Sequence, residues 1–144
     1  MALISEETRL LQQAAARAAE NAYAPYSGFR VGAALLLDDG TTVTGGNVEN
    51  MSYGLTICAE RSALVRAVAE KGPAVRVKAI AVTNLNHAAS PPCGACRQVL
   101  SEFVTDDATI SFPSEAGTEN LPFATLMPFA FKFAPPKPPS AESE

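Results

Sequence analysis

Residues 75–104 read VRVKAIAVTNLNHAASPPCGACRQVLSEFV and contain a strand, a loop and a helix in succession. Residues 75–83 are rich in β-branched side chains, and the Ile-Ala-Val run inside them indicates burial on both faces of a sheet. A helix is predicted from residue 93 or 94 to residue 104, and another strand at 109–112. A strand that leads through a helix into a second strand is typical of a crossover. This region therefore indicates a layered α/β domain.

The part of the chain before residue 75 supplies the remaining expected elements. Ser5 is suited to cap the start of a first helix, whose apolar side chains recur at helical spacing. An Asp-Asp-Gly turn signal between two β-rich runs indicates a hairpin, and a Gly-Pro pair ends a second helix. The expected elements are a helix from residue 5 to about 22, strands at 31–37 and 41–44, a loop at 47–56 and a helix at 59–70.

The composition fits one globular domain, because 47% of the 144 residues are hydrophobic and 18% are charged. The net charge of −4 argues against a nucleic-acid partner, which requires a basic surface. No apolar run approaches the roughly 20 residues that cross a bilayer, so we expect no membrane partner. The domain is expected to cover residues 1–133, and the proline-rich residues 134–144 are expected to form a flexible tail.

Three cysteines, Cys58, Cys93 and Cys96, indicate a metal site. Three thiols cannot all pair with one another, and the first residues do not read as a signal peptide, so a reducing, cytoplasmic setting is expected. Three thiolates with an open fourth position make a catalytic zinc site, whereas a closed structural site takes four protein ligands. We therefore expect one Zn²⁺ per chain. Glu60, two residues after Cys58, is placed to move protons to and from a water molecule.

The spacing of Cys58 and Glu60 sets a geometric condition. Two residues correspond to about 200° of rotation on a helix, so the pair shares one site only if Cys58 lies just before the helix begins. Thiolates at helix starts also gain from the positive end of the helix dipole, which lowers the pKa of a thiol. Zinc with three thiolates carries a formal charge of −1. That charge favours Glu60 as proton acceptor and Arg61 as a hydrogen-bond donor to sulfur.

Three other interpretations of the cysteines are open at this point. Cys93 and Cys96 at the start of a helix also fit a thioredoxin-type redox pair. His87 with the three cysteines fits a closed structural zinc site. All three thiols also fit buried small apolar side chains. The combination of Cys58 and Glu60 with the second cysteine pair favours a catalytic metal over these alternatives.

Four motifs in this order resemble those of the small, homotetrameric cytidine deaminases, and the resemblance covers about residues 20–131. The motifs are Tyr-Ser-Gly-Phe-Arg-Val-Gly-Ala-Ala at 26–34, Asn-Val-Glu-Asn at 47–50, Cys-Ala-Glu-Arg at 58–61 and Pro-Cys-Gly-Ala-Cys-Arg-Gln at 92–98. Together they are far more specific than any one of them. The resemblance implies a three-layer α/β/α domain with a mixed central sheet.

The same resemblance implies a reaction and its main residues. Cys58, Cys93 and Cys96 are expected to bind zinc, and Glu60 to carry protons while water attacks C4 of cytosine and ammonia leaves. The substrates implied are cytidine and 2′-deoxycytidine, which become uridine and 2′-deoxyuridine in pyrimidine salvage. The partner is then a small nucleoside, and the active sites lie at the subunit interfaces of a homotetramer.

Substrate contacts follow from the resemblance residue by residue. Phe29 is similar to the aromatic residue that packs on the base, and Asn47 and Glu49 to the pair that holds the ribose hydroxyls. The Ala59 backbone is expected to contact the base, Arg61 and Gln98 to support the site, and Phe131 to reach a neighbouring subunit's site. The other expected substrate contacts are Val48, Asn50, Met51, Ser52 and Tyr53.

Two alternative functions accompany this reading. A blasticidin-S-type deaminase shares the zinc motif but acts on a modified cytosine compound, whereas Asn47 and Glu49 favour an unmodified ribose. A structural zinc module without catalysis would use His87 as its fourth ligand. The stretch 90–93 reads Ser-Pro-Pro-Cys where the family commonly has Ser-Pro-Cys, which shifts the serine by one residue on the side where ammonia leaves.

Overall fold

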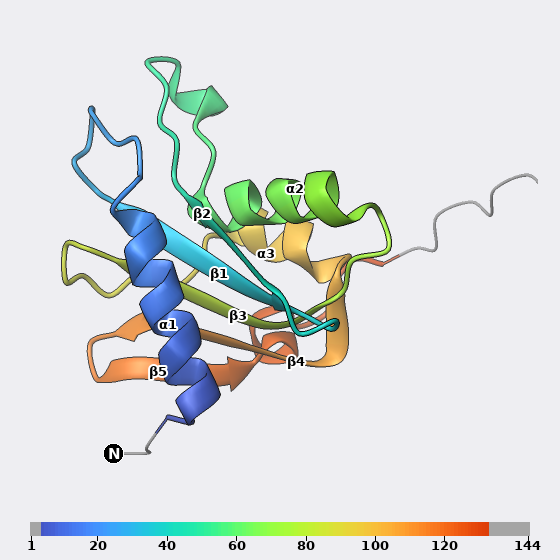
Figure 1. The fold of residues 1–144 in the computed structure, drawn as a ribbon. Helices are drawn as coiled ribbons and strands as arrows, with labels where there is room; N and C mark the ends of the chain where they lie inside the picture. The colour runs from blue at the N-terminus through green and yellow to red at the C-terminus, as the bar shows by residue number, and fades with distance from the viewer. Residues whose placement is uncertain (1–3, 133–144) are drawn as a thin grey trace, which may run out of the picture.

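The computed structural model describes residues 4–132 and consists of a five-stranded mixed sheet between helices (Figure 1). The strand order is β2-β1-β3-β4-β5, with β3 and β4 parallel and the other neighbours antiparallel. A hairpin and a helical crossover therefore meet in one sheet. The strands are β1 Val31–Leu37, β2 Thr42–Gly46, β3 Val77–Asn84, β4 Val104–Ser114 and β5 Gly117–Pro122.

Helices cover both faces of the sheet, so the expected three-layer α/β/α architecture is confirmed (Figure 1). Side chains of β1 alternate between two cores, because successive residues of a strand point to opposite faces. Ala34 packs in one core with Leu11 and Ala15, and Ala33 and Leu35 belong to the other. The first core lies under α1 Glu6–Ala19. The second lies under α2 Ala59–Lys71 and α3 Gly94–Ser101.

Two glycines of the hairpin allow the helices to approach the sheet closely. A Cβ atom on Gly32 would lie 1.9 Å from the carbonyl oxygen of Ala15 in α1. A Cβ atom on Gly45 would lie 2.5 Å from the backbone nitrogen of Ala63 in α2. Both distances are far below van der Waals contact, so these positions accept glycine and no larger residue without movement of a helix.

The structure corrects several predicted element boundaries, most of them from β3 onward. The first helix ends at Ala19, before the expected residue 22, and β3 begins at Val77, two residues later than expected. Helix α3 ends at Ser101 because β4 already begins at Val104. The start of β4 was missed because its side chains are polar and mostly exposed, with an irregular register against β3.

Strand β5 was absent from the predicted elements. It forms the edge of the sheet, where four of its six residues are exposed, so no strong apolar alternation marks it. Two short 3-10 helices complete the structure, η1 Tyr53–Leu55 and η2 Phe123–Leu126. The predicted tail at 134–144 lies outside the described residues. Within 4–132, none of the helices is both long and apolar enough to cross a membrane.

Candidate active site

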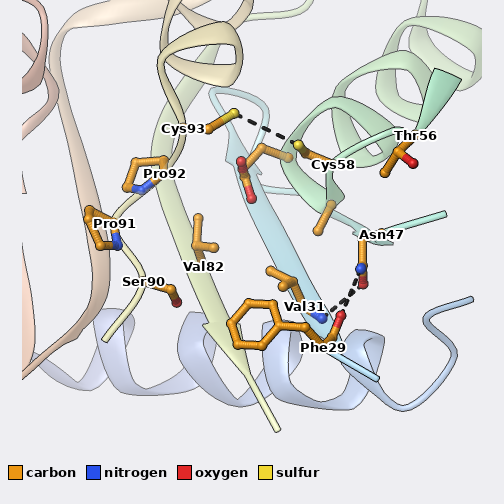
Figure 2. Close-up of a pocket in the computed structure, with 12 residues that line it drawn as sticks. Phe29, Val31, Asn47, Thr56, Cys58, Val82, Ser90, Pro91, Pro92 and Cys93 are labelled. Atoms are coloured by element: carbon orange, nitrogen blue, oxygen red, sulfur yellow. Dashed lines mark hydrogen bonds between the residues drawn. The ribbon is translucent and has the colours of Figure 1, made fainter. Parts of the chain in front are cut away.

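The three cysteines come together where α2 and α3 begin. Cys58 directly precedes α2 and Cys93 directly precedes α3, both with extended backbone, while Cys96 is buried in the first turn of α3. The Sγ atoms of Cys58 and Cys93 are 3.8 Å apart (Figure 2), and those of Cys93 and Cys96 are 3.2 Å apart. The condition set by the sequence, that Cys58 lies just before its helix, is therefore met.

The cluster suits one tetrahedral zinc ion. With Zn–S bonds of about 2.3 Å, tetrahedral geometry separates two sulfur atoms by about 3.8 Å. All three Sγ atoms lie within 4.8 Å of one another, so small adjustments of the side chains would place each at bonding distance from one zinc ion. Neither His87 nor Glu60 belongs to this cluster, and among residues 4–132 it has three potential ligands. A fourth coordination position is thus left for a water or substrate atom.

These positions decide between the alternative interpretations of the cysteines. A closed site with His87 is wrong, because that residue lies outside the cluster in an exposed loop. A simple redox pair does not explain why Cys58 joins Cys93 and Cys96. Burial as apolar side chains fits Cys96 alone, since Cys93 is exposed and Cys58 is half-buried.

Arg61 compensates part of the negative charge of the thiolates. Its Nη2 donates to the Sγ of Cys58 at 3.4 Å, and its Nε is buried without an acceptor among the described residues. In the metal-free chain, the Cys96 thiol donates to Cys58 and, together with Arg61, lowers the pKa of Cys58 to about 5. The same hydrogen bond and burial raise the pKa of Cys96. One thiolate is therefore already favoured before metal binds.

Glu60 is a buried carboxyl group beside the cluster. It lies in the first turn of α2 and is 3% exposed. Burial raises its pKa above the usual value for a glutamate, because the charged form loses hydration, and the charge of Cys58 adds to this effect. A carboxyl group in this environment holds a proton more readily than a solvent-exposed glutamate does.

A cavity of about 220 Å³ opens onto Glu60 and two of the cysteines. Its walls come from the start of β1, the end of β3 and the loop before α3, and most of them are apolar (Figure 2). A cavity of this size, mostly apolar with a few polar groups at one end, suits a small planar ring. The lining residues are Phe29, Val31, Asn47, Thr56, Cys58, Ala59, Glu60, Val82, Ser90, Pro91, Pro92 and Cys93.

Asn47 and Glu49 hold the backbone at the edge of this cavity. The amide of Asn47, 8% exposed, donates to the carbonyl of Phe29 at 2.8 Å and accepts from the nitrogen of Val31 at 2.9 Å (Figure 2). Glu49 accepts from the backbone nitrogens of Tyr26 and Ser27 at 3.0 and 3.1 Å, and from the Ser27 hydroxyl. That hydroxyl lowers the pKa of Glu49, which is consequently ionised at neutral pH.

A second hollow of about 310 Å³ adjoins the first. Thr56 lines both, so the two hollows are neighbours. The second is more polar in its residue types than the first. It is lined by Tyr26, Ser27, Glu49, Asn50, Tyr53 and Thr56.

Several expected contact residues lie away from both hollows in the single chain. Val48 forms isolated bridges to neighbouring backbone with its side chain half-exposed, and Met51 and Ser52 project into solvent. Gln98 is exposed on α3, and Phe131 is 71% exposed near the end of the described region.

Sequence reasoning assigned site roles to half of the twelve residues that line the cavity, namely Phe29, Asn47, Cys58, Ala59, Glu60 and Cys93. The motif before Cys93 gave a signal for Ser90, Pro91 and Pro92, because those residues directly precede a ligand. Val31 and Val82 gave none, because an apolar strand residue that ends at a cavity looks like any other core residue.

The comparisons with known proteins agree with this site. The model of the cytidine and deoxycytidylate deaminase zinc-binding region matches residues 5–111. The cytidine deaminase of Halalkalibacterium halodurans is 44% identical over 126 residues, which cover 87% of this chain and 94% of that protein. The structure of cytidine deaminase from Mycobacterium tuberculosis has a TM-score of 0.76 and 41% identity, covering 87% of this chain and 97% of its own.

A further solved structure extends the agreement over a whole relative. Cytidine deaminase from Burkholderia pseudomallei has a TM-score of 0.77 and 42% identity, covering 89% of this chain and all of its own. The matched region includes both helix starts that carry the cysteines. The chain therefore belongs to the family of cytidine and deoxycytidylate deaminases defined by this zinc-binding region.

Proposed function

We propose that this protein is a zinc-dependent hydrolase that converts cytidine and 2′-deoxycytidine to uridine and 2′-deoxyuridine with release of ammonia. The observation that carries the proposal is a buried carboxyl group beside three clustered thiols, at the end of a cavity that fits a planar base. Proteins named cytidine deaminase at 44–49% identity support the reaction. Such a reaction serves pyrimidine salvage, and three unpaired thiols favour the reducing cytoplasm.

The proposed zinc ligands are Cys58, Cys93 and Cys96. Zinc held there would act as a Lewis acid and lower the pKa of a water molecule at the open coordination position. Arg61 keeps the Cys58 sulfur in its thiolate form by donating to it. The helix starts beside Cys58 and Cys93 add partial positive charge at the same place.

Glu60 carries the protons of the proposed reaction. Its carboxylate accepts a proton as the oxygen of water bonds to C4 of the base, and it delivers a proton to N3. It then takes the remaining proton from the hydroxyl on C4 and passes it to the amino nitrogen as the C4–N bond breaks, so ammonia leaves and the oxygen stays on C4 as the carbonyl. Burial of Glu60 suits this role, because a raised pKa makes the carboxylate a better proton acceptor.

Binding of a neutral nucleoside follows from the two adjoining hollows. The ring of Phe29 and the neighbouring apolar wall are proposed to pack on the base and to exclude water. Asn47 and the ionised Glu49 are proposed to accept from ribose hydroxyls, with Asn50 and Tyr53 beside them in the second hollow. The net charge of −4 disfavours a polynucleotide, whose phosphates would be repelled.

We further propose that the active form is a homotetramer. Several large apolar side chains are exposed in the single chain, among them Met51, Tyr53 and Leu55 in and beside the loop at 47–56, and Phe129 and Phe131 near the end of the described region. A monomer rarely leaves so many exposed together without a partner. In a tetramer, Phe131 of a neighbour and the segment 48–53 would complete the substrate site. Light scattering after gel filtration measures the mass directly, and a monomer at micromolar concentration would overturn this part of the proposal.

The proposed function is tested by ammonia release from cytidine, 2′-deoxycytidine, cytosine and blasticidin S, with purified protein that contains one zinc per chain. We expect turnover of the two nucleosides and little of the others. The matched variant Glu60→Gln keeps the size of the side chain but cannot accept a proton. It should retain zinc and fold, and lose turnover by at least about a hundredfold. Retained activity in this variant, or no ammonia from cytidine in the parent protein, would refute the assignment.

A further inference from the structure

The backbone on both sides of Phe29 is held by an asparagine from a distant loop. The Oδ1 atom of Asn86 accepts from the nitrogen of Arg30 at 3.1 Å, and its Nδ2 donates to the carbonyl of Gly28 at 3.2 Å. Asn86 is exposed and does not line the cavity. The side-chain amide of Asn86 therefore binds both residues that flank Phe29, and it does so from outside the cavity.

These two bonds continue the ladder between β1 and β3. Val31 pairs with Asn84 at the last register position, and the nitrogen of Leu85 donates to the carbonyl of Arg30 at 3.0 Å. Beyond that point the side-chain amide of Asn86 makes the hydrogen bonds to Gly28 and Arg30 that the backbone of β3 would make if the strand continued. A carboxamide can do so because it offers one donor and one acceptor, as a peptide group does. The segment that carries Phe29 is therefore attached to the end of β3 although neither is regular strand there.

Asn84 connects Asn86 to the opposite wall of the cavity. Its side chain is 8% exposed, and its Oδ1 accepts from the nitrogen of Asn86 at 3.0 Å. Its Nδ2 donates to the Oγ of Ser90 at 2.8 Å, and Ser90 lines the cavity together with Pro91. One chain of hydrogen bonds thus runs from the backbone of Gly28 through two asparagines to Ser90. The chain joins the wall that holds Phe29 to the wall formed by the loop before α3.

The left-handed backbone of Gly28 makes this attachment necessary. Its φ of +69° lies in a region that other residues rarely adopt, and a glycine here also leaves the segment easily deformed. Asn47 fixes the far side of Phe29 through its carbonyl and through Val31. The nitrogen of Phe29 donates to the Oγ of Ser27 at 2.9 Å, and Asn86 adds hydrogen bonds to the carbonyl of Gly28 and the nitrogen of Arg30.

We infer that Asn86 is a positioning residue for Phe29, which fixes the separation between the aromatic ring and the Ser90 wall at the thickness of a planar base. The inference rests on the proposed function, in which Phe29 packs on the base. It concerns recognition of substrate and leaves the chemistry at Glu60 unaltered. A change at Asn86 should therefore act on KM, because the ring contacts the base equally in the ground state and in the transition state.

The kinetic test compares Asn86→Ala with the parent protein on cytidine. Loss of two side-chain hydrogen bonds, one of them to a strained glycine segment, should raise KM about five- to tenfold and leave kcat within about twofold. Asn86→Asp keeps the acceptor for Arg30 but places an oxygen against the carbonyl of Gly28, so its KM should rise at least as much. The matched control is Asn120→Ala, an exposed asparagine of β5 that donates to Thr8 at 3.3 Å, and it should match the parent.

A second readout follows the ring without any turnover. In protein labelled with 4-fluorophenylalanine, the ¹⁹F resonance of Phe29 is identified by its loss in Phe29→Leu. Asn86→Ala should broaden or shift this resonance and leave the other phenylalanine signals unchanged, with zinc content also unchanged. This readout separates failure of the inference from failure of the proposed function, since it needs no deaminase activity. An unchanged KM, a loss confined to kcat, or an unchanged Phe29 resonance would overturn the inference.

Discussion

Replacement of Gly45 by alanine should disturb the metal site from the opposite side of α2. The added Cβ would lie 2.5 Å from the nitrogen of Ala63 and 3.0 Å from the carbonyl oxygen of Ala59. An ordinary contact begins at 3.4 Å, so the first turns of α2 must move away from the hairpin by about 0.9 Å. These turns carry Glu60 and follow Cys58 directly, so the displacement reaches the sulfur cluster.

The cost is estimated from other overpacked cores. Forced insertion of a methyl group into a packed interface usually costs about 1–3 kcal/mol, which for a domain of this size lowers Tm by about 3–10 °C. Gly32→Ala provides the comparison, because its Cβ would lie 1.9 Å from Ala15 in α1, a helix that carries no cysteine. Gly54→Ala provides the baseline, because no atom lies within 4 Å of its Cβ position.

The assay combines thermal unfolding with competition for zinc against a chromogenic chelator. Gly32→Ala and Gly45→Ala should both lower Tm, but the rate of zinc loss should increase in Gly45→Ala, by about tenfold if 1.4 kcal/mol of the strain reaches the bound state. Gly54→Ala should leave both quantities unchanged. If Gly45→Ala lost Tm but kept its zinc as firmly as Gly32→Ala, the link between hairpin packing and the metal site would be refuted.

Three further predictions concern charge and ligation. In metal-free protein, alkylation of Cys58 should follow a thiolate with a pKa of about 5, so the alkylation rate should stay constant between pH 6 and 8. Arg61→Gln removes a cation that stabilises the thiolate, so the midpoint of the alkylation pH profile should move to higher pH. Atomic absorption should find one zinc per chain in His87→Ala and much less zinc in Cys96→Ser. Loss of zinc in His87→Ala with full zinc in Cys96→Ser would restore the closed-site interpretation. Glu49→Gln should raise KM for cytidine with kcat nearly unchanged, because the lost charge faces the second hollow and not Glu60; an equal fall of kcat would argue against its place at the ribose.

The parts of the fold that sequence patterns predicted are those determined by local chemistry. The start of α2 just after Cys58 was predicted because a shared site with Glu60 was impossible inside a regular helix. The hairpin was predicted because a turn signal separates two β-rich runs. Strand β5 was missed because an exposed edge strand needs no apolar alternation, and its pairing with β4 forms only in the folded chain.

In the candidate site, too, the residues that could be predicted are those whose own chemistry and spacing determine their role. The three cysteines and Glu60 were identifiable because their residue types and spacing determine their chemistry, whatever the fold. Asn47 was expected at the ribose, and its Nδ2 donates to Phe29 while its Oδ1 accepts from Val31, which leaves the Oδ1 one further acceptor position. Asn86 gave no signal, because its role depends on the ladder between β1 and β3, which joins segments more than fifty residues apart.

The charge balance at the cluster explains why Glu60 and Arg61 are neighbours on one helix. Three thiolates and one zinc ion leave a charge of −1, which by itself would raise the pKa of Glu60 further and hold its proton too firmly for transfer. Arg61 donates to Cys58 on the protein side, and the two helix starts add partial positive charge. The cluster then has a net charge near zero. In the metal-free chain, burial is the main cause of the raised pKa of Glu60, and the positive charge of Arg61 acts in the opposite direction to the negative charge of Cys58.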